Sequence, residues 1–152
     1  MDDLVNFLSL SELFKDIHPK DLEKLSDFLE TEHFDVNINV FGEDDLGDNL
    51  YILYRGSVKI IVRAVWHMKQ EEMIQIIRPG EIFGEFSFID GCRRSASAIT
   101  VDKSKVLILS KEKFDRFSID NPAAALSIMQ NFAWILTQKI RNTTMLWRSD
   151  KM

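Results

Sequence analysis

The feature that most constrains the fold is a series of short β-rich segments in the middle of the chain. Branched and aromatic residues cluster in five runs, at residues 51–54, 58–62, 73–77, 98–101 and 106–109. Turn-forming pairs such as Arg55-Gly56 and Pro79-Gly80 separate the runs. No helical pattern of ten or more residues lies between them, so the crossover connections of a parallel sheet are missing. This part of the chain therefore predicts an antiparallel β-sandwich or β-roll.

Helical patterns flank the β-rich region on both sides. Apolar residues recur at helical spacing in two sets over residues 4–29, on either side of His18-Pro19. This predicts two short helices, with Pro19 in the first turn of the second, where its missing N–H costs no hydrogen bond. Helical spacing returns over residues 111–118 and again from Pro122 to about Trp147.

The last predicted helix carries a wide apolar stripe. Its main line is formed by Leu126, Met129, Ala133, Leu136, Ile140 and Trp147, and it is widened by Ile128, Phe132 and Ile135. Burial against the β-rich region accounts for much of such a stripe. The length and width of the stripe also predict a parallel homodimer formed through the same helix.

The length and composition of the chain favour a single domain. A chain of 152 residues can build one hydrophobic core but is short for two. With 45% hydrophobic residues it can order itself, which excludes disordered and collagen-like chains. We therefore expect one α+β domain over residues 1–152, with N-terminal helices over about 1–32 and C-terminal helices over 111–148. Between them, residues 33–110 are expected to form the antiparallel β-sandwich or β-roll.

Charge and cysteine content exclude several classes of partner and location. The 19 Lys and Arg against 24 Asp and Glu give a net charge of −5, whereas DNA-binding domains present a basic surface, so no nucleic-acid partner is expected. Cys92 is the only cysteine, which excludes an internal disulfide and fits a reducing compartment. The acidic N-terminus and the interrupted apolar stretch at residues 123–136 predict neither a signal peptide nor a membrane span. We therefore expect a cytoplasmic protein without a membrane partner.

The sequence does not indicate catalysis or metal binding. The three histidines, His18, His33 and His67, are far apart and form no His-x-His pair. No Ser-His-Asp or Cys-His arrangement is indicated, and the motifs of triphosphate and dinucleotide sites are missing. We expect a protein that is not an enzyme and that has no metal and no cofactor.

The candidate binding site lies in residues 78–97, which read RPGEIFGEFSFIDGCRRSAS. Gly80, Gly84 and Gly91, half of the six glycines of the chain, fall within this segment. Such glycines let the backbone approach a ligand closely, and a one-turn helix starting near Gly84 would offer free N–H groups to an anion. Because Arg94 follows shortly afterwards, the segment predicts a cradle for a single phosphate group.

Glu85 lies at the mouth of this predicted cradle. A carboxylate beside a phosphate site repels the anion unless the carboxylate binds something neutral, and sugar hydroxyls are its natural partners. A ribose that carries a compact monoanionic phosphate would satisfy both the cradle and Glu85.

This segment closely resembles the phosphate-binding cassette of the cyclic nucleotide-binding domain family, through PGEIFGEFSF at residues 79–88 and RSAS at 94–97. The resemblance extends to GDNLYILYRGSV at residues 47–58, which matches the central hairpin of the family. It also includes the N-terminal helices and the terminal segment, which looks like the hinge and lid helices of the family. The resemblance implies that residues 33–110 form an antiparallel double-stranded, jelly-roll-like β-roll of about eight strands. By this resemblance the cassette covers residues 80–97, and Asn37 replaces a family glycine, a mild change because asparagine tolerates positive φ.

The resemblance implies a role for each site residue. The N–H of Gly84 and the carboxylate of Glu85 would contact the ribose 2′-hydroxyl, and Arg94 with Ser95 and the N–H of Ala96 would hold the cyclic phosphate. Other implied contacts are Phe83 in the cassette, Ile60 and Ile74 beside the base, and the lid residues Lys139, Ile140 and Asn142. Lys139 and Ile140 stand where the bacterial catabolite activator has hydroxyl side chains, so recognition of the base by the lid stays open.

The resemblance implies a stand-alone sensor that binds cAMP in preference to cGMP. Nothing on the lid presents a carboxylate to guanine, which favours cAMP. Because the chain ends at Met152, no DNA-binding domain is expected. Movement of the C-terminal helix would then signal to an unknown effector protein. The alternative is a degenerate domain that acts as a protein-interaction scaffold without binding nucleotide.

Overall fold

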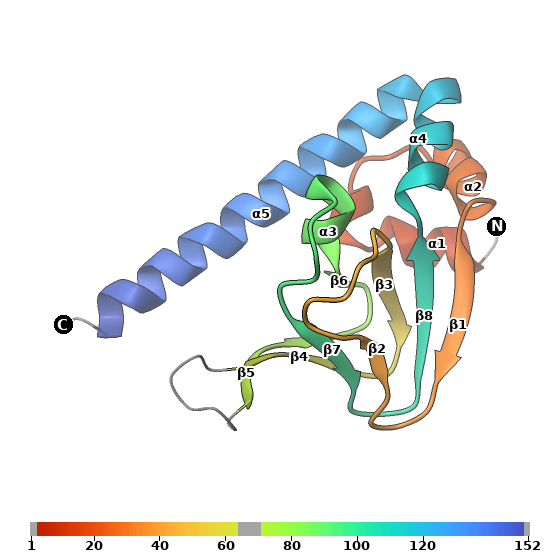
Figure 1. Ribbon diagram of the computed structural model, residues 1–152. Coiled ribbons are helices and arrows are strands. Elements are labelled where there is room, and N and C mark those ends of the chain that lie inside the picture. The colour runs from red at the N-terminus through yellow and green to blue at the C-terminus, as the bar shows by residue number, and fades with distance from the viewer. Residues whose placement is uncertain (1–2, 64–70, 151–152) are drawn as a thin grey trace.

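The computed structural model describes residues 3–63 and 71–150 and shows an antiparallel β-roll with helices at both ends (Figure 1). The first sheet has the order β1-β8-β3-β6, formed by β1 (Glu30–Phe34), β8 (Ser104–Leu109), β3 (Leu50–Arg55) and β6 (Ile82–Phe83). The second has the order β2-β7-β4-β5, formed by β2 (Asn39–Phe41), β7 (Ser97–Thr100), β4 (Val58–Arg63) and β5 (Glu71–Ile77). These sheets confirm the α+β class and the antiparallel roll. The first strand begins at Glu30 rather than at residue 33.

The sheet β1-β8-β3-β6 separates two hydrophobic cores. Along β3, Leu50 and Ile52 belong to the core beneath the helices, whereas Tyr51 and Leu53 belong to the core inside the roll. Successive side chains of a strand point to opposite faces of its sheet, so both faces of β3 are buried. The same alternation in β8 explains why these two strands read as nearly continuous apolar runs.

The N-terminal segment forms three short helices rather than two. They are α1 (Asp3–Ser9), the 3-10 helix η1 (Glu12–Phe14) and α2 (Pro19–Ser26). The first predicted helix is interrupted at Leu10, which is 85% exposed and takes no part in the core. Pro19 is the first residue of α2, as predicted, and His18 caps this helix by accepting a hydrogen bond from the N–H of Lys20 at 3.1 Å.

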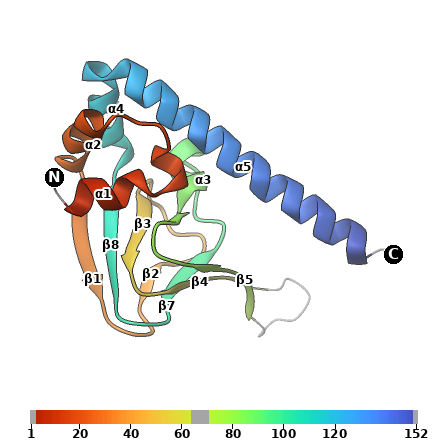
Figure 2. The same cartoon turned by 180° about the vertical axis from the view of Figure 1, so that it is seen from behind.

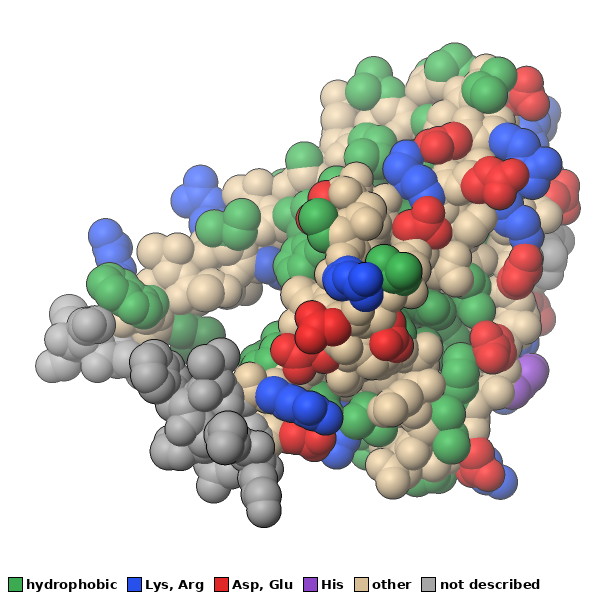
Figure 3. Space-filling view, in the orientation of Figure 1, with side chains coloured by type: hydrophobic (Ala, Val, Ile, Leu, Met, Phe, Trp, Pro, Cys, Tyr) green, Lys and Arg blue, Asp and Glu red, His purple; other side chains and the backbone are tan. Residues whose placement is uncertain are grey.

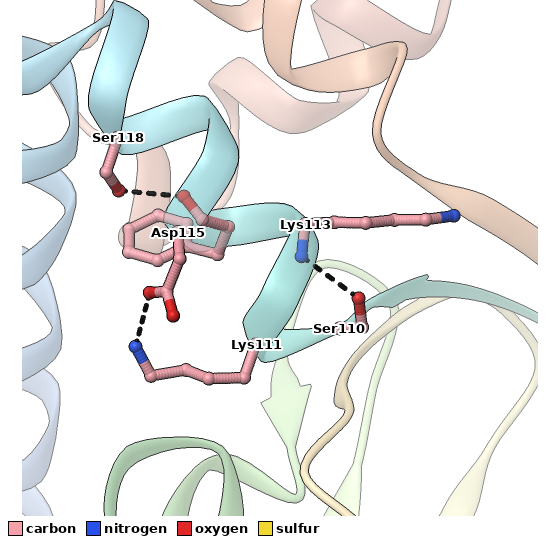
Figure 4. A network of polar contacts seen from close by, with 6 residues as sticks. Ser110, Lys111, Lys113, Asp115 and Ser118 are labelled. Carbon is pink, nitrogen blue, oxygen red and sulfur yellow. Dashed lines mark hydrogen bonds and ion pairs between the residues drawn. The ribbon is translucent and has the colours of Figure 1, made fainter.

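Helix α4 (Lys111–Asp120) begins directly after β8 and is stabilised by local contacts (Figure 4). The Oγ of Ser110 accepts a hydrogen bond from the N–H of Lys113 at 3.2 Å, which satisfies one of the free donors of the first turn. Lys111 and Asp115 form an ion pair at 2.6 Å, one turn apart on the helix surface. These contacts fix the start of the helical segment that leads into α5.

Helix α5 (Pro122–Asp150) runs past α3 (Glu85–Asp90) and projects beyond the β-roll in both views (Figures 1 and 2). Its buried residues are Ala124, Ala125, Ile128, Phe132 and Ile135. The predicted main line of the apolar stripe is therefore wrong. The buried line includes Ile128, Phe132 and Ile135, which were expected only to widen the stripe. Along the expected main line, Leu126 is 61% exposed and Ile140 is 68% exposed. The space-filling view shows hydrophobic side chains at the surface along α5 (Figure 3).

A side-chain contact fixes the last helix against the N-terminal segment. The Nδ2 of Asn131 on α5 donates hydrogen bonds to the carbonyl oxygens of Leu13 and Lys15, which fixes α5 against η1.

Asn37 has a φ of 60°, which confirms that it adopts the left-handed conformation expected of a residue in place of a glycine.

Candidate functional site

The glycine that precedes α3 is required by both its conformation and its surroundings. Gly84 follows β6 and has a φ of 74°, in the left-handed region that favours glycine. A Cβ atom at this position would lie 2.9 Å from Nη1 of Arg94 and 3.2 Å from the carbonyl oxygen of Asn49. The backbone of Gly84 therefore approaches Arg94 more closely than any side chain would allow.

Arg94 is the central charged group of the site. The residue is 3% exposed, its Nη1 donates to the carbonyl oxygen of Gly84 at 2.9 Å, and its Nη2 donates to that of Asn49 at 3.0 Å. Its buried Nε has no hydrogen-bond partner among the described residues. Burial away from water lowers the pKa of Arg94 below its ordinary value, and Tyr51 and Asp48 act in the opposite direction.

Aromatic rings support the guanidinium from inside the roll. Its carbon atom lies 4.4 Å from the ring centroid of Phe41 and 5.6 Å from that of Tyr51. Phe83 stacks on Tyr51 with a centroid separation of 5.2 Å. Attraction between the cation and the ring faces offsets part of the desolvation cost of burying Arg94.

The loop before β3 holds the backbone on either side of this arginine. The N–H of Arg94 donates to the carbonyl oxygen of Asp45 at 2.9 Å, and the N–H of Asp44 donates to the carbonyl oxygen of Arg94 at 2.8 Å. Arg93 points away to the exposed face, where its Nη1 donates to the carbonyl oxygen of Asp44 at 3.0 Å. The two adjacent arginines thus have different surroundings, one buried and one on the surface.

A cavity of about 500 Å³ opens beside Arg94 and contains most of the predicted site residues. The predicted residues that line it are Phe83, Gly84, Glu85, Arg94, Ser95, Ala96, Ile60, Ile74, Lys139 and Asn142. The cavity lies between the β-roll, α3 and the middle of α5, so segments far apart in the sequence meet there. Its volume falls within the range of small-molecule sites, about 300–1,000 Å³.

Ile140 is the predicted site residue that the structure does not bring to the cavity. The residues of α5 that line the cavity are Lys139, Asn142, Thr143 and Leu146, which follow helical spacing and share one face. Ile140 is rotated by about 100° from Lys139 around the helix axis and points to the surface.

Sequence reasoning missed several residues that line the same cavity. They are Phe41, Gln75, Phe86, Ser87, Thr143 and Leu146. Thr143 and Leu146 could have been found from Lys139 and Asn142, because positions three and four apart on a helix are neighbours. Phe41 has no such signal, because only the pairing of β2 with β7 brings it to the site.

Glu85 is nearly buried and already has a partner. Its carboxylate forms an ion pair with the ammonium of Lys139, which joins the first residue of α3 to the middle of α5. The side chain of Glu85 is 7% exposed and that of Lys139 is 30% exposed. The two candidate ligand contacts are therefore in contact with each other.

Metal-binding clusters and membrane-spanning helices are both absent from the part of the chain that the structure describes. It contains no cluster of three or more His, Cys, Asp or Glu side chains able to hold a metal ion. Of the three histidines of the chain, His67 lies outside the described residues. Among the same described residues, no helix has both the length and the apolar character needed to cross a membrane.

Comparison with known proteins gives a consistent result. The sequence matches the cyclic nucleotide-binding domain over residues 31–121. A cAMP-dependent protein kinase regulatory subunit of Eremothecium gossypii is 32% identical over 111 residues, which are 73% of this chain and 23% of that protein. The human cGMP-dependent protein kinase 2 is 31% identical over 112 residues, which are 73% of this chain and 15% of that protein.

A solved structure supports the same assignment. The Thermus thermophilus catabolite activator protein superposes with a TM-score of 0.81 at 26% identity, over 91% of this chain and 62% of that one. The chain thus spans less than two thirds of the length of each of these relatives. Because the sequence match covers more than half of the residues, the chain belongs to the cyclic nucleotide-binding domain family.

Proposed function

We propose that this chain binds a 3′,5′-cyclic purine nucleotide, cAMP in preference to cGMP, in the cavity beside Arg94. On this proposal it is a cytoplasmic regulatory module and not an enzyme. The observation that carries the proposal is the environment of Arg94, a buried guanidinium whose Nε has no partner among the described residues. A buried cation without a counter-charge in contact binds an anion strongly, because the anion replaces the lost solvation.

The remaining cassette residues suit the other parts of such a ligand. Ser95 and the N–H of Ala96 would join Arg94 at the cyclic phosphate, while the N–H of Gly84 and the carboxylate of Glu85 would bind the ribose. All five residues line the same cavity. A cyclic phosphate carries one negative charge, which matches the positive charge of the buried Arg94.

The apolar part of the cavity suits a purine base. Ile60, Ile74 and Phe83 line it and would pack against the flat faces of the ring system. The cavity residues on α5 are Lys139, Asn142, Thr143 and Leu146, none of which is acidic. A carboxylate would accept from both the N1–H and the amino group of guanine, so a lining from α5 without a carboxylate favours adenine.

Titration calorimetry with cAMP, cGMP and 5′-AMP tests the proposal. We expect cAMP to bind with a dissociation constant in about the micromolar range, cGMP more weakly, and 5′-AMP, with its open dianionic phosphate, most weakly. Millimolar or absent binding of both cyclic nucleotides would contradict the proposal. It would instead support a degenerate domain that acts as a protein-interaction scaffold.

The output of the module would be carried by α5. Its projecting part exposes Ile140, Met145 and Leu146, and three of its other side chains line the cavity. A ligand that contacts the cavity face would change the position of the helix and hence the surface offered to an effector protein.

The exposed apolar residues of α5 also support a homodimer formed through this helix. We expect sedimentation velocity of the full chain to show a concentration-dependent dimer. Met145→Glu should weaken the dimer, because it places a charge on the projecting part of α5, whereas Val36→Glu on an exposed loop of the roll should not. A monomer at all concentrations, or equal effects of both variants, would contradict dimerisation through α5.

A further inference from the structure

The ion pair between Lys139 and Glu85 stands where the proposed ligand would bind. Both residues line the cavity of about 500 Å³, and Lys139 is the only ion-pair partner of Glu85 among the described residues. With the ammonium in place, the side chain of Glu85 is only 7% exposed. The ammonium occupies Oε1 of this carboxylate, so a ligand hydroxyl can bind that oxygen only after the ammonium has moved aside.

Lys139 also lines a second cavity, which gives its ammonium another place to lie. This second cavity measures about 480 Å³ and extends between η1, the turn before β6 and α5. Gln75, Lys139 and Asn142 line both cavities, so Lys139 stands at the boundary between them. Glu12 and Glu81 line the second cavity and provide carboxylates for a displaced ammonium.

We propose that Lys139 gates Glu85, so that a ribose 2′-hydroxyl binds Oε1 of this carboxylate only by displacing the ammonium. This inference rests on the proposed function and adds to it a residue that sets ligand specificity. Opening the ion pair costs free energy, so the full benefit of the hydroxyl is not realised in the wild-type protein. The wild-type protein therefore discriminates less between cAMP and 2′-deoxy-cAMP than a protein in which Glu85 has no ion-pair partner. Displacement of Lys139 also breaks a contact between α5 and α3, which couples ligand binding to the helix.

The test combines a change in the protein with a change in the ligand. The affinities of cAMP and 2′-deoxy-cAMP are measured on wild type, Lys139→Met and Arg141→Met. Arg141 is a matched control, because it is an exposed cation on the same helix and lines neither cavity. We expect the preference for cAMP over 2′-deoxy-cAMP to increase about five-fold or more in Lys139→Met, since the hydroxyl no longer has to displace a charge. The same preference should not change in Arg141→Met.

Two results would overturn the gate. An unchanged or smaller preference for cAMP in Lys139→Met would show that Lys139 orients Glu85 for the ribose. An equal loss of affinity for cAMP and 2′-deoxy-cAMP would show that Lys139 binds the nucleotide directly. Absence of cAMP binding in the wild-type protein would instead refute the proposed function, and with it the role of Lys139 as a gate.

Hydrogen exchange without nucleotide tests the ion pair separately. We expect faster exchange around residues 136–146 in Lys139→Met than in wild type or Arg141→Met, because the contact that holds α5 to α3 is lost. Equal exchange in all three proteins would show that the ion pair does not restrain the helix and would overturn the coupling to α5.

Discussion

At the scale of single residues, the charge of Arg94 is the feature on which ligand affinity should depend most. Arg94→Ala removes the buried guanidinium and leaves the phosphate with backbone donors and a hydroxyl alone. We expect a loss of about 2–4 kcal/mol of binding free energy, or roughly thirty-fold to a thousand-fold in affinity, measured by calorimetry. Arg93→Ala is the matched control, because Arg93 lies on the surface, where it donates a hydrogen bond to the carbonyl oxygen of Asp44. A larger effect of Arg93→Ala would place the cassette one residue out of register.

Gly84 gives a second prediction at this scale, on stability rather than affinity. Gly84→Ala adds a Cβ that clashes with the Arg94 side chain, and the new alanine has to adopt a φ of 74°. Gly91→Ala is a matched control with a φ of 70° and no atom within 4 Å of the added Cβ. We expect Gly91→Ala to lower the free energy of unfolding by about 1–2 kcal/mol and Gly84→Ala to lower it further, in urea titrations. Equal decreases in the free energy of unfolding would show that the clash with Arg94 does not destabilise the protein.

The candidate site could be predicted from the sequence where its residues are contiguous. Residues 83–85 and 94–96 belong to one segment whose glycines and arginine carry the chemistry, and all of them line the cavity. Phe41 and Gln75 could not be predicted, because they come from strands that reach the site only through the pairing of the second sheet. The contact of Lys139 with Glu85 was also missed, since it joins residues 54 positions apart.

At the scale of elements, the limits of sequence reasoning are clearest in α5 and in the short strands. The apolar residues of α5 cover two adjacent faces, and helical spacing alone cannot decide which one packs against the roll. Strand β1 reads ETEHF and is mostly exposed at a sheet edge, so it lacks the apolar alternation that marks a strand. Strand β6 has two residues and leaves no periodic signal. Strands β3, β4 and β8 were predicted because apolar residues fill their buried positions, and β5 was predicted from its run of branched residues although most of it is exposed.

The packing face of α5 leads to a prediction about stability. Phe132 is fully buried and stacks on Phe88 of α3 with a centroid separation of 5.7 Å, whereas Leu126 is largely exposed. Phe132→Ala should lower the free energy of unfolding by about 3–5 kcal/mol, since it leaves a cavity in the core between α5 and α3. Leu126→Ala should change it by less than about 0.5 kcal/mol. Urea titration of both variants distinguishes this packing from the originally expected stripe, for which Leu126→Ala would be the more damaging.

At the scale of the whole molecule, the two cores share the strands β3 and β8. One face of these strands packs against the helices, and the other closes the roll behind Tyr51 and Phe83, which support Arg94. The helices and the binding cavity therefore depend on the same sheet, and loss of either core exposes the other. We expect the domain to unfold as a single cooperative unit, so that binding at the cavity stabilises the helices as well.

Ligand binding should then raise the stability of the entire domain by a calculable amount. Because the folded chain alone presents the cavity, the free energy of unfolding rises by about 2.7 kcal/mol at a cAMP concentration of 100 times the dissociation constant. For a chain of this size that corresponds to an increase in Tm of roughly 5–11 °C, measurable by calorimetry or circular dichroism. At the same cAMP concentration Arg94→Ala, with its roughly thirty-fold to thousand-fold lower affinity, should gain less than about 0.9 kcal/mol, at most about a third of the wild-type increase, while Arg93→Ala should behave as wild type. An increase that is equal in Arg94→Ala and wild type would mean that the nucleotide acts elsewhere on the molecule. Separate transitions for the helices and the roll, with only one of them shifted, would mean that the shared strands do not couple the two cores.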